Sequence, residues 1–301
     1  MATVIITGGT GMVGTLLSKM LIARGEKVII LTTQKKVSQP NAQIQYVYWQ
    51  PSQQLIDSAF QSDQCSIINL AGAGVADKRW SPARKNEIRD SRVMSLQTLY
   101  QAIASGQLKA SKVVSASAIG YYAPSMGILH ESAPADQHFL SDTCVLWEQE
   151  ALKLQALKVQ TTIARIGIVL SQEGGALKAF LNSFNFGVAG IPGDGKQMVS
   201  WIHIEDICRL MLYLLDTPTQ GIYNAVADQP VSTNELFEAI LKYKKGIKIH
   251  VPSWVIKFML GEMSTEILKS AHVSNLKIRE QGFCFNYKNI EDAIKNLLGK
   301  S

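Results

Sequence analysis

A glycine-rich turn between a strand and a helix, close to the start of the chain, constrains the fold more than any other feature. The β-branched run at residues 4–6 predicts a buried parallel strand, and glycines follow at Gly8, Gly11 and Gly14. Apolar residues then recur at helical spacing. In such a unit the first glycine allows the tight turn, the second lets phosphates approach the backbone, and the third lets helix and strand pack closely. The order predicts a site for a dinucleotide pyrophosphate on the amide groups of a helix N-terminus. The residues expected at this site are Thr7, Gly8, Gly9, Thr10, Gly11, Met12, Val13 and Gly14. The alternative is a turn of the same shape without a cofactor.

The end of the second expected strand, at 28–31, bears on the choice of cofactor. An NAD-specific site carries an acidic residue there for the ribose 2′-hydroxyl. This chain has no Asp or Glu between Lys27 and Gln50, and the strand runs instead into Thr32, Thr33, Gln34, Lys35 and Lys36. The lysines are close to the expected position of a 2′-phosphate, which favours NADP(H) over NAD(H). The alternative is that both lysines face solvent and that the site accepts either cofactor.

Two further strands, expected at 65–70 and 112–117, bring polar and small residues to the same edge of the sheet. Ligands of open α/β sheets bind at the carboxyl ends of the strands. The first strand delivers Asn69, Leu70, Ala71 and Gly72 toward the cofactor, although Asn69 could instead cap its own turn. The second strand delivers the hydroxyl groups of Ser117, Tyr121 and Tyr122, which are suited to hold a carbonyl or an alcohol.

A basic and aromatic segment, Lys78, Arg79 and Trp80, precedes a helix expected at 82–105. Ser81 and Pro82 are typical of its N-cap and first position. The basic side chains beside tryptophan could clamp an anionic substrate, or the segment could be a surface loop anchored by Trp80. A second helix is expected at 142–157, with Ser141 as its N-cap.

The remaining chain divides at about residue 170, where turn-rich sequence begins. We expect a Rossmann domain at 1–170, a substrate-facing α/β lobe at 171–248 and a C-terminal helical domain at 249–301. A strand is expected at 161–170. The residues at 232–235 form a capping box that opens a helix.

Composition and charge exclude several classes of protein. No apolar run reaches the roughly 18 residues that a membrane span needs, and the start has no basic region followed by an apolar run, so we expect a cytoplasmic protein. The four cysteines are far apart, which predicts reduced thiols and no metal site. The net charge of +6 is spread along the chain without a basic stripe that aromatic residues interrupt. We therefore expect a small-molecule substrate and no nucleic acid.

With these residues in view, the chain resembles the extended and atypical short-chain dehydrogenase/reductase superfamily. It is most similar to NAD(P)-dependent nucleotide-sugar-epimerase-like proteins with an extra C-terminal helical domain. The resemblance rests on the glycine turn, Asn69 to Gly72, Lys78 to Trp80, Ser115 to Tyr122, Arg165 to Leu170, Trp201 to Asp206, Val251-Pro252, Gly261-Glu262 and Gly282-Phe283. It implies a doubly wound parallel sheet with NADP(H) across the glycine turn and a substrate cleft between the lobes. It also implies that Arg165 contacts the cofactor and His203 the substrate, although a lone histidine can equally be structural.

The catalytic residues depart from those of the superfamily, which uses a serine and a Tyr-x-x-x-Lys pair. The serine matches Ser117, but the tyrosine position falls on Leu140 and the lysine position on Cys144. Tyr121, Tyr122, His203 or Cys144, whose pKa a helix N-terminus could lower, could stand in.

Two hypotheses follow from these residues. The first is an NADP(H)-dependent oxidoreductase or epimerase acting on a carbonyl or secondary alcohol of a polar, nucleotide-sugar-like substrate. Ser117 would bind the substrate oxygen, with Tyr121 or Tyr122 as proton donor. The second is a non-catalytic NADP(H)-binding sensor or partner-binding module. The protein is expected to be a monomer, or a homodimer formed through helices 82–105 and 142–157.

Overall fold

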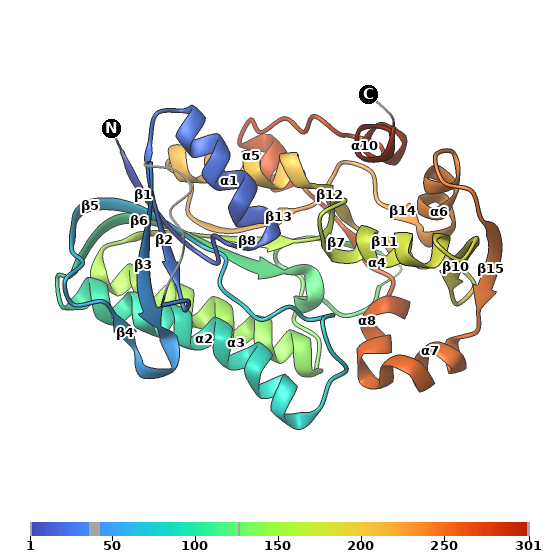
Figure 1. The fold of residues 1–301 in the computed structure, drawn as a ribbon, viewed down its shortest axis with the longest axis horizontal. Helices are drawn as coiled ribbons and strands as arrows, with labels where there is room; N and C mark the ends of the chain where they lie inside the picture. Colours follow the sequence, from blue (N-terminus) through green and yellow to red (C-terminus); the bar gives the residue numbers. More distant parts are fainter. Residues whose placement is uncertain (1, 36–42, 126, 300–301) are drawn as a thin grey trace.

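A mostly parallel sheet forms the centre of the molecule (Figure 1). The computed structural model describes residues 2–35, 43–125 and 127–299. Across these residues, eight strands lie in the order β13-β8-β6-β5-β1-β2-β3-β4, and only β4 runs antiparallel to its neighbour. The strands are β1 (Thr3–Thr7), β2 (Lys27–Thr32), β3 (Ile44–Gln50), β4 (Leu55–Ile56), β5 (Ser62–Asn69), β6 (Leu108–Ala118), β8 (Gln160–Ile166) and β13 (Gly221–Ala225). The predicted doubly wound fold is confirmed.

The strand order places a crevice directly above β1. From β1 the chain adds β2 and β3 on one side, and from β5 it adds β6 and β8 on the other. The connections therefore leave the carboxyl ends of β1 and β5 in opposite directions. Such a switch point is where open α/β sheets bind their ligands. The glycine turn follows β1 and therefore lies in this crevice.

Helices cover both faces of the sheet because the strands are apolar on both sides. α1 (Met12–Ala23) and α5 (Ile204–Asp216) lie on one face, and α2 (Pro82–Ala104) and α3 (Phe139–Lys153) on the other (Figure 1). Alternation along β1 sends Val4 and Ile6 into the core below α1 and α5, and Ile5 into the second core. All three side chains are at most 1% exposed.

Two predicted elements have different limits in the structure. The strand expected at 161–170 divides at Gly167 into β8 and β9 (Ile168–Leu170), because β9 leaves the main sheet and pairs with β12 (Trp201–His203). A Cβ atom on Gly167 would lie 2.5 Å from the Ser200 carbonyl oxygen. The helix expected at 142 begins at Phe139 instead. Its N-cap is His138, whose Nδ1 accepts a bond from the Ser141 amide at 3.3 Å, while the Ser141 hydroxyl donates to the Tyr121 carbonyl.

Two other helices begin at the N-cap residues that the sequence predicts. The Ser81 hydroxyl accepts a bond from the Arg84 amide at 3.2 Å and caps α2. The expected capping box of Ser232 and Glu235 opens α6 (Thr233–Leu241). Both are local signals that depend on three or four adjacent residues, so tertiary packing does not override them.

The second half of the chain forms short paired strands and helices beside the sheet. The strand β13 belongs to the segment expected as a separate lobe, yet it pairs with β8 and extends the main sheet.

The short strands outside the main sheet form four pairs, which are β9–β12, β10–β15, β11–β14 and β7–β16. Their other strands are β7 (Ile128–Leu129), β10 (Val188–Pro192), β11 (Met198–Val199), β14 (Val231–Ser232), β15 (Ile247–Val251) and β16 (His272–Val273). The helices are α4 (Gly175–Phe184), α7 (Ser253–Leu260), α8 (Ser264–Leu268), α9 (Leu276–Glu280) and α10 (Ile290–Leu298). Among the described residues, no helix combines the length and the apolar character needed to cross a membrane.

Candidate functional site

The glycine turn has the close contacts that a phosphate-binding turn requires. Gly8 has a positive φ of 67°, and a Cβ atom there would lie 2.7 Å from the Leu70 carbonyl oxygen. A Cβ atom on Gly14 would lie 2.5 Å from the Gly8 carbonyl oxygen. Gly11 is the N-cap of α1 and has no side chain to bond the first amides of the helix. Thr10 and Gly11 are exposed, so the positive end of α1 is accessible to an anion.

Thr7 and Asn69, both expected to contact the cofactor, hold the turn in place instead. The Thr7 hydroxyl donates to Asn69 Oδ1 at 2.6 Å and accepts from the amides of Leu70 and Ala71 at 3.2 and 3.1 Å. Asn69 Nδ2 donates to the Ser115 hydroxyl at 3.1 Å. Both side chains are fully buried. They therefore connect β1, β5 and β6 below the crevice, and leave ligand contacts to the backbone above them.

A pocket of about 560 Å³ adjoins the glycine turn. Its walls come from the turn, the ends of β2, β3 and β5, and one side of α2. The lining residues are Gly8, Thr10, Leu31, Thr32, Thr33, Trp49, Gln50, Pro51, Ser52, Ala71, Gly72, Glu87, Asp90, Ser91 and Met94. Six of these belong to the set expected to bind the cofactor. The α2 residues were missed because only packing of α2 on the sheet brings them to the pocket.

The lysine expected to meet a 2′-phosphate lies near this pocket without lining it. Lys35 is exposed, and its Nζ lies 5.8 Å from the centre of the Tyr48 ring. Lys36 lies outside the described residues. Thr33 lines the pocket, and no carboxylate is present at the end of β2. The acidic lining residues, Glu87 and Asp90, belong to the opposite wall on α2.

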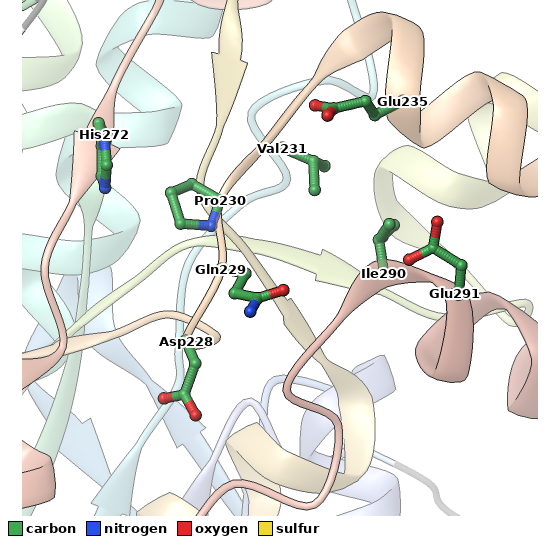
Figure 2. A pocket seen from close by; sticks show the side chains of 8 residues that line it. All are labelled: Asp228, Gln229, Pro230, Val231, Glu235, His272, Ile290 and Glu291. Carbon is green, nitrogen blue, oxygen red and sulfur yellow. The ribbon is translucent and has the colours of Figure 1, made fainter.

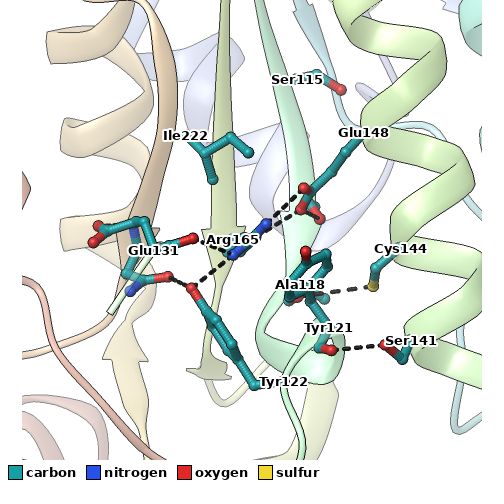
Figure 3. A network of polar contacts seen from close by, with 12 residues as sticks. Ser115, Ala118, Tyr121, Tyr122, Glu131, Ser141, Cys144, Glu148, Arg165 and Ile222 are labelled. Carbon is teal, nitrogen blue, oxygen red and sulfur yellow. Dashed lines mark hydrogen bonds and ion pairs between the residues drawn. The ribbon is translucent and has the colours of Figure 1, made fainter. Parts of the chain in front are cut away.

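The predicted catalytic hydroxyl groups belong to a buried network (Figure 3). Arg165 on β8 forms a two-bond ion pair with Glu148 on α3, with both bonds at 2.8 Å. The Ser117 hydroxyl donates to the same carboxylate at 2.7 Å. The Tyr122 hydroxyl accepts from Arg165 at 2.9 Å and donates to Asn224 at 2.6 Å. Ser117 and Arg165 are register partners on β6 and β8, so the sheet itself brings them together.

This network corrects the roles expected for Ser117, Tyr122 and Arg165. Each of the three side chains is at most 2% exposed. Burial raises the pKa of Tyr122 to about 12, against a smaller opposing effect of Arg165. Burial alone would lower the pKa of Arg165, but the ion pair with Glu148 raises it overall. A fully engaged hydroxyl that holds its proton as strongly as Tyr122 is a poor proton donor, and the Arg165 guanidinium is buried and paired with Glu148.

Tyr121 differs from Tyr122, because part of its side chain remains accessible. Its ring covers the network: the Arg165 guanidinium carbon lies 3.5 Å from the ring centre, and the Tyr122 ring meets it edge-on at 5.4 Å. A cation against an aromatic face is attracted by the ring quadrupole. Tyr121 thus covers one side of the buried network and keeps part of its side chain exposed.

Leu140 and Cys144 occupy the positions of the absent tyrosine and lysine on the first turns of α3. Leu140 is 8% exposed and Cys144 is 2% exposed. The Cys144 thiol lies 3.7 Å from the Ala118 carbonyl oxygen. Burial, together with the nearby Glu148 carboxylate, raises the pKa of this thiol to about 12. The helix N-terminus therefore does not lower the pKa of Cys144, which is a buried and protonated thiol.

The loop at 73–80 supports the alternative interpretation of Trp80 as an anchor. The Trp80 indole donates to the Val75 carbonyl at 2.9 Å, and its ring meets Phe139 edge-on at 5.0 Å. Lys78 and Arg79 are exposed. Arg79 lies against the C-terminal segment, since a Cβ atom on Gly261 would be 3.0 Å from its Nε. The loop therefore bridges the first domain and the C-terminal helices.

His203 has a structural position rather than the expected contact with substrate. It is 1% exposed and is the N-cap of α5, where its Nδ1 accepts from the Glu205 amide at 3.1 Å. Its ring stacks on Tyr287 with 3.7 Å between centres. Burial lowers its pKa, so the neutral ring is favoured. The structural alternative thus describes His203 correctly.

A second pocket, of about 470 Å³, lies in the C-terminal half (Figure 2). Three carboxylates line it, and each already has a partner. Asp228 accepts from Asn275 at 2.8 Å, Glu235 closes the capping box of α6, and Glu291 lies 3.7 Å from Lys242. Within the described ranges, no group of three or more His, Cys, Asp and Glu side chains could hold a metal ion.

Comparison with known proteins places this geometry in context. Residues 4–225 match the model of the NAD dependent epimerase/dehydratase family, and residues 251–297 match a domain of unknown function, DUF1731. An epimerase family protein of Staphylococcus aureus is 36% identical, with 98% of this chain and 99% of that protein covered. The human epimerase family protein SDR39U1 (isoform 2), solved with NADPH, is 25% identical with a TM-score of 0.87, covering 99% of this chain and 100% of that one. A nucleoside-diphosphate sugar epimerase from Corynebacterium glutamicum is 27% identical with a TM-score of 0.76, covering 99% of this chain and 58% of that one.

Proposed function

Because the chain belongs to the NAD dependent epimerase/dehydratase family, we propose that it binds NADP(H) and transfers hydride to or from a carbonyl or secondary alcohol. The observation that carries this proposal is the glycine turn beside a pocket of about 560 Å³. A side chain at Gly8 or Gly14 would collide with backbone atoms, so the turn is built to present amide groups. The human relative solved with NADPH supports the choice of cofactor.

In this proposal the backbone of the turn holds the pyrophosphate, and the pocket holds the adenosine. Thr32 and Thr33 border the ribose, and the exposed Lys35 reaches its 2′-phosphate. The absence of an acidic residue at the end of β2 removes the repulsion that such a phosphate would meet. The bound nicotinamide supplies or accepts the hydride. The partly exposed Tyr121 would border the substrate, and the exposed Lys78 and Arg79 would attract a polar, anionic substrate resembling a nucleotide sugar.

A second candidate function is a cofactor-binding module without catalysis. It is favoured by Leu140 and Cys144, which put a hydrocarbon and an inert thiol where the superfamily carries its tyrosine and lysine. A measurement of NADPH oxidation distinguishes the two functions. An enzyme oxidises NADPH when a suitable carbonyl compound is added, whereas a binding module holds NADPH without turnover.

The binding test exploits the N-cap position of Gly11. We expect Gly11→Asp to fold normally, because aspartate is a favoured N-cap, and to weaken NADPH binding roughly 100-fold because its charge faces the pyrophosphate. Gly11→Asn is the matched control for charge, with the same shape and cap. Because either side chain crowds the approach of the phosphates, we expect Gly11→Asn to bind NADPH more weakly than the wild type but more tightly than Gly11→Asp. Calorimetric titration measures both. Equal affinities of wild type and Gly11→Asp would remove the proposed phosphate site.

The turnover test uses NADPH with a panel of aldehydes, ketones and quinones, and NADP⁺ with UDP-glucose and UDP-glucuronic acid. We expect the absorbance of the reduced nicotinamide to change with at least one compound. Gly11→Asp should lose that reaction at cofactor concentrations that saturate the wild type. Tight NADPH binding without any turnover would favour the binding module.

A further inference from the structure

Four ionisable side chains form a cluster at the N-terminus of α3 that the roles above do not use. Asp136 and His138 come from the segment before α3, and Glu266 and Lys269 come from α8 and the residues after it. His138 Nε2 lies 3.0 Å from Asp136 Oδ2, 3.2 Å from Glu266 Oε1 and 3.4 Å from Lys269 Nζ. The side chains of Asp136, His138 and Glu266 are 23, 28 and 19% exposed, so they can exchange protons with solvent.

The cluster lies where the superfamily has its tyrosine. The turn at Gly120 touches Leu140, which occupies the tyrosine position, and a Cβ atom on Gly120 would lie 3.7 Å from Leu140 Cβ. The same Cβ atom would lie 3.8 Å from Glu266 Oε2. Lys269 Nζ also lies 3.5 Å from the Gly120 carbonyl oxygen. The carboxyl group of Glu266 and the side chain of Leu140, at the tyrosine position, therefore lie against the same turn.

One carboxylate oxygen in the cluster has no hydrogen bond. Glu266 Oε1 is buried and has no hydrogen-bond partner among the described residues, since its 3.2 Å contact with His138 is an ion-pair distance without hydrogen-bond geometry. The single hydrogen that His138 Nε2 can carry faces two carboxylates, Asp136 and Glu266. A carboxylate oxygen that is buried without a hydrogen bond is costly when charged, and protonation of the carboxyl group relieves that cost.

Burial accordingly raises the pKa of Glu266. The neighbouring cations Lys269 and His138 oppose this rise, and Asp136 adds to it. These three groups and Glu266 are the titratable groups that face one another here. Lys269 therefore affects Glu266 as the superfamily lysine affects its tyrosine. In each pair, the cation lowers the pKa of the neighbouring acid.

We propose, resting on the proposed function, that Glu266 is the acid/base that exchanges a proton with the substrate oxygen, and that His138 and Lys269 position it. In the reduction, the carbonyl carbon gains a hydride from the reduced nicotinamide and the carbon–oxygen π pair moves to oxygen. That oxygen takes the carboxyl proton of Glu266, whose O–H bond breaks to leave a carboxylate. Solvent returns the proton through His138. In the oxidation, the carboxylate takes the hydroxyl proton as hydride leaves the carbon. The C-terminal domain therefore completes the active site.

The kinetic test compares Glu266→Gln with Glu262→Gln, measured on the panel compound that the wild type reduces fastest. Glu262 belongs to the same C-terminal segment, but its carboxylate forms a surface ion pair with Lys85. We expect Glu266→Gln to lower turnover about 100-fold or more, which is a typical contribution of general acid catalysis. Its affinity for NADPH in calorimetry should stay within twofold of the wild type, since the glycine turn is unchanged. Glu262→Gln should retain turnover.

The second test measures proton binding without substrate or cofactor. The carboxyl carbon of Glu266 is titrated by NMR in the full chain, with Glu266→Gln to assign its signal. We expect Lys269→Met to raise the pKa of Glu266 and Asp136→Asn to lower it, because these neighbours act in opposite directions. Circular dichroism verifies that each variant is folded.

Each outcome bears on a different part of the proposal. Turnover that survives in Glu266→Gln overturns the role of Glu266 and leaves the proposed function intact. A Glu266 titration that neither Lys269→Met nor Asp136→Asn moves overturns the positioning roles. A wild type that binds NADPH but reduces no compound overturns the proposed reaction, and the role of Glu266 with it.

Discussion

The glycine turn and the N-terminus, or head, of α3 are the two regions to which we assign a function, and they are assembled in different ways. The turn is continuous in sequence, from β1 through Gly14, and its contacts are mostly within that segment and to Leu70. The head of α3 gathers Gly120, His138 and Glu266 from three distant segments. A site made of adjacent residues can be recognised from spacing, whereas a site made by packing cannot. In the proposed function, cofactor binding therefore depends on adjacent residues, whereas proton transfer depends on residues that only the complete fold brings together.

The two regions also use buried polar groups differently. Below the turn, the neutral side chains of Thr7 and Asn69 satisfy one another and the adjacent amides. Beside the head of α3, Arg165 and Glu148 form a buried ion pair. Removing one member of such a pair leaves an unpaired buried charge, which costs far more than the pair contributes. The comparison therefore predicts that the second region is the more sensitive to single substitutions.

The largest expected effect tests that sensitivity directly. Glu148→Gln should destabilise the protein by about 3–5 kcal/mol, because it leaves the buried Arg165 guanidinium without a counter-charge. Glu150→Gln, the same substitution on the same helix, removes only a partner of the exposed Lys153 and should cost less than about 1 kcal/mol. Urea unfolding measures both. If both variants lost the same free energy of unfolding, the prediction that the buried ion pair is more sensitive than the surface pair would be wrong.

A smaller effect is expected beside the glycine turn. Lys35→Glu should weaken NADPH binding about tenfold and leave NADH binding nearly unchanged, because only NADPH carries the 2′-phosphate. Lys19→Glu changes the net charge equally from an exposed position on α1 and serves as the control. Calorimetry with both cofactors measures the preference. A preference for NADPH that persists in Lys35→Glu would assign the phosphate contact to another residue.

The smallest effect concerns His203, the N-cap of α5. Burial lowers its pKa below that of the unfolded chain, about 6.5. Between these two pKa values the unfolded state binds more protons, so the free energy of unfolding decreases as pH falls below about 6.5. His203→Gln should reduce this acid sensitivity, so that the free energy of unfolding decreases less steeply below about pH 6.5 than in the wild type. His250→Gln should not, since His250 is exposed. Urea unfolding at several pH values would show whether the slopes of wild type and His203→Gln differ, and identical slopes would contradict the prediction.

The sequence was informative where structure is local. The strand, the glycine turn, the cap at Ser81 and the capping box at Ser232 all depend on a few adjacent residues. The sequence was misleading where the local pattern suggests an accessible side chain but tertiary packing buries it. Ser117 and Tyr122 lie at and beyond the end of a strand, as catalytic residues often do, yet the pairing of β6 with β8 places Ser117 beside Arg165, and Arg165 donates to Tyr122. Glu266 gave no signal, because nothing in its neighbourhood indicates that α8 returns to the head of α3.

The return of α8 has a consequence for synthesis of the protein. Every residue that lines the adenosine-sized pocket has left the ribosome once Met94 has emerged, but the carboxyl group facing Gly120 belongs to residue 266. If the two proposed roles are right, a chain truncated before α8 would retain every residue of the pocket and lack its proton-transfer group.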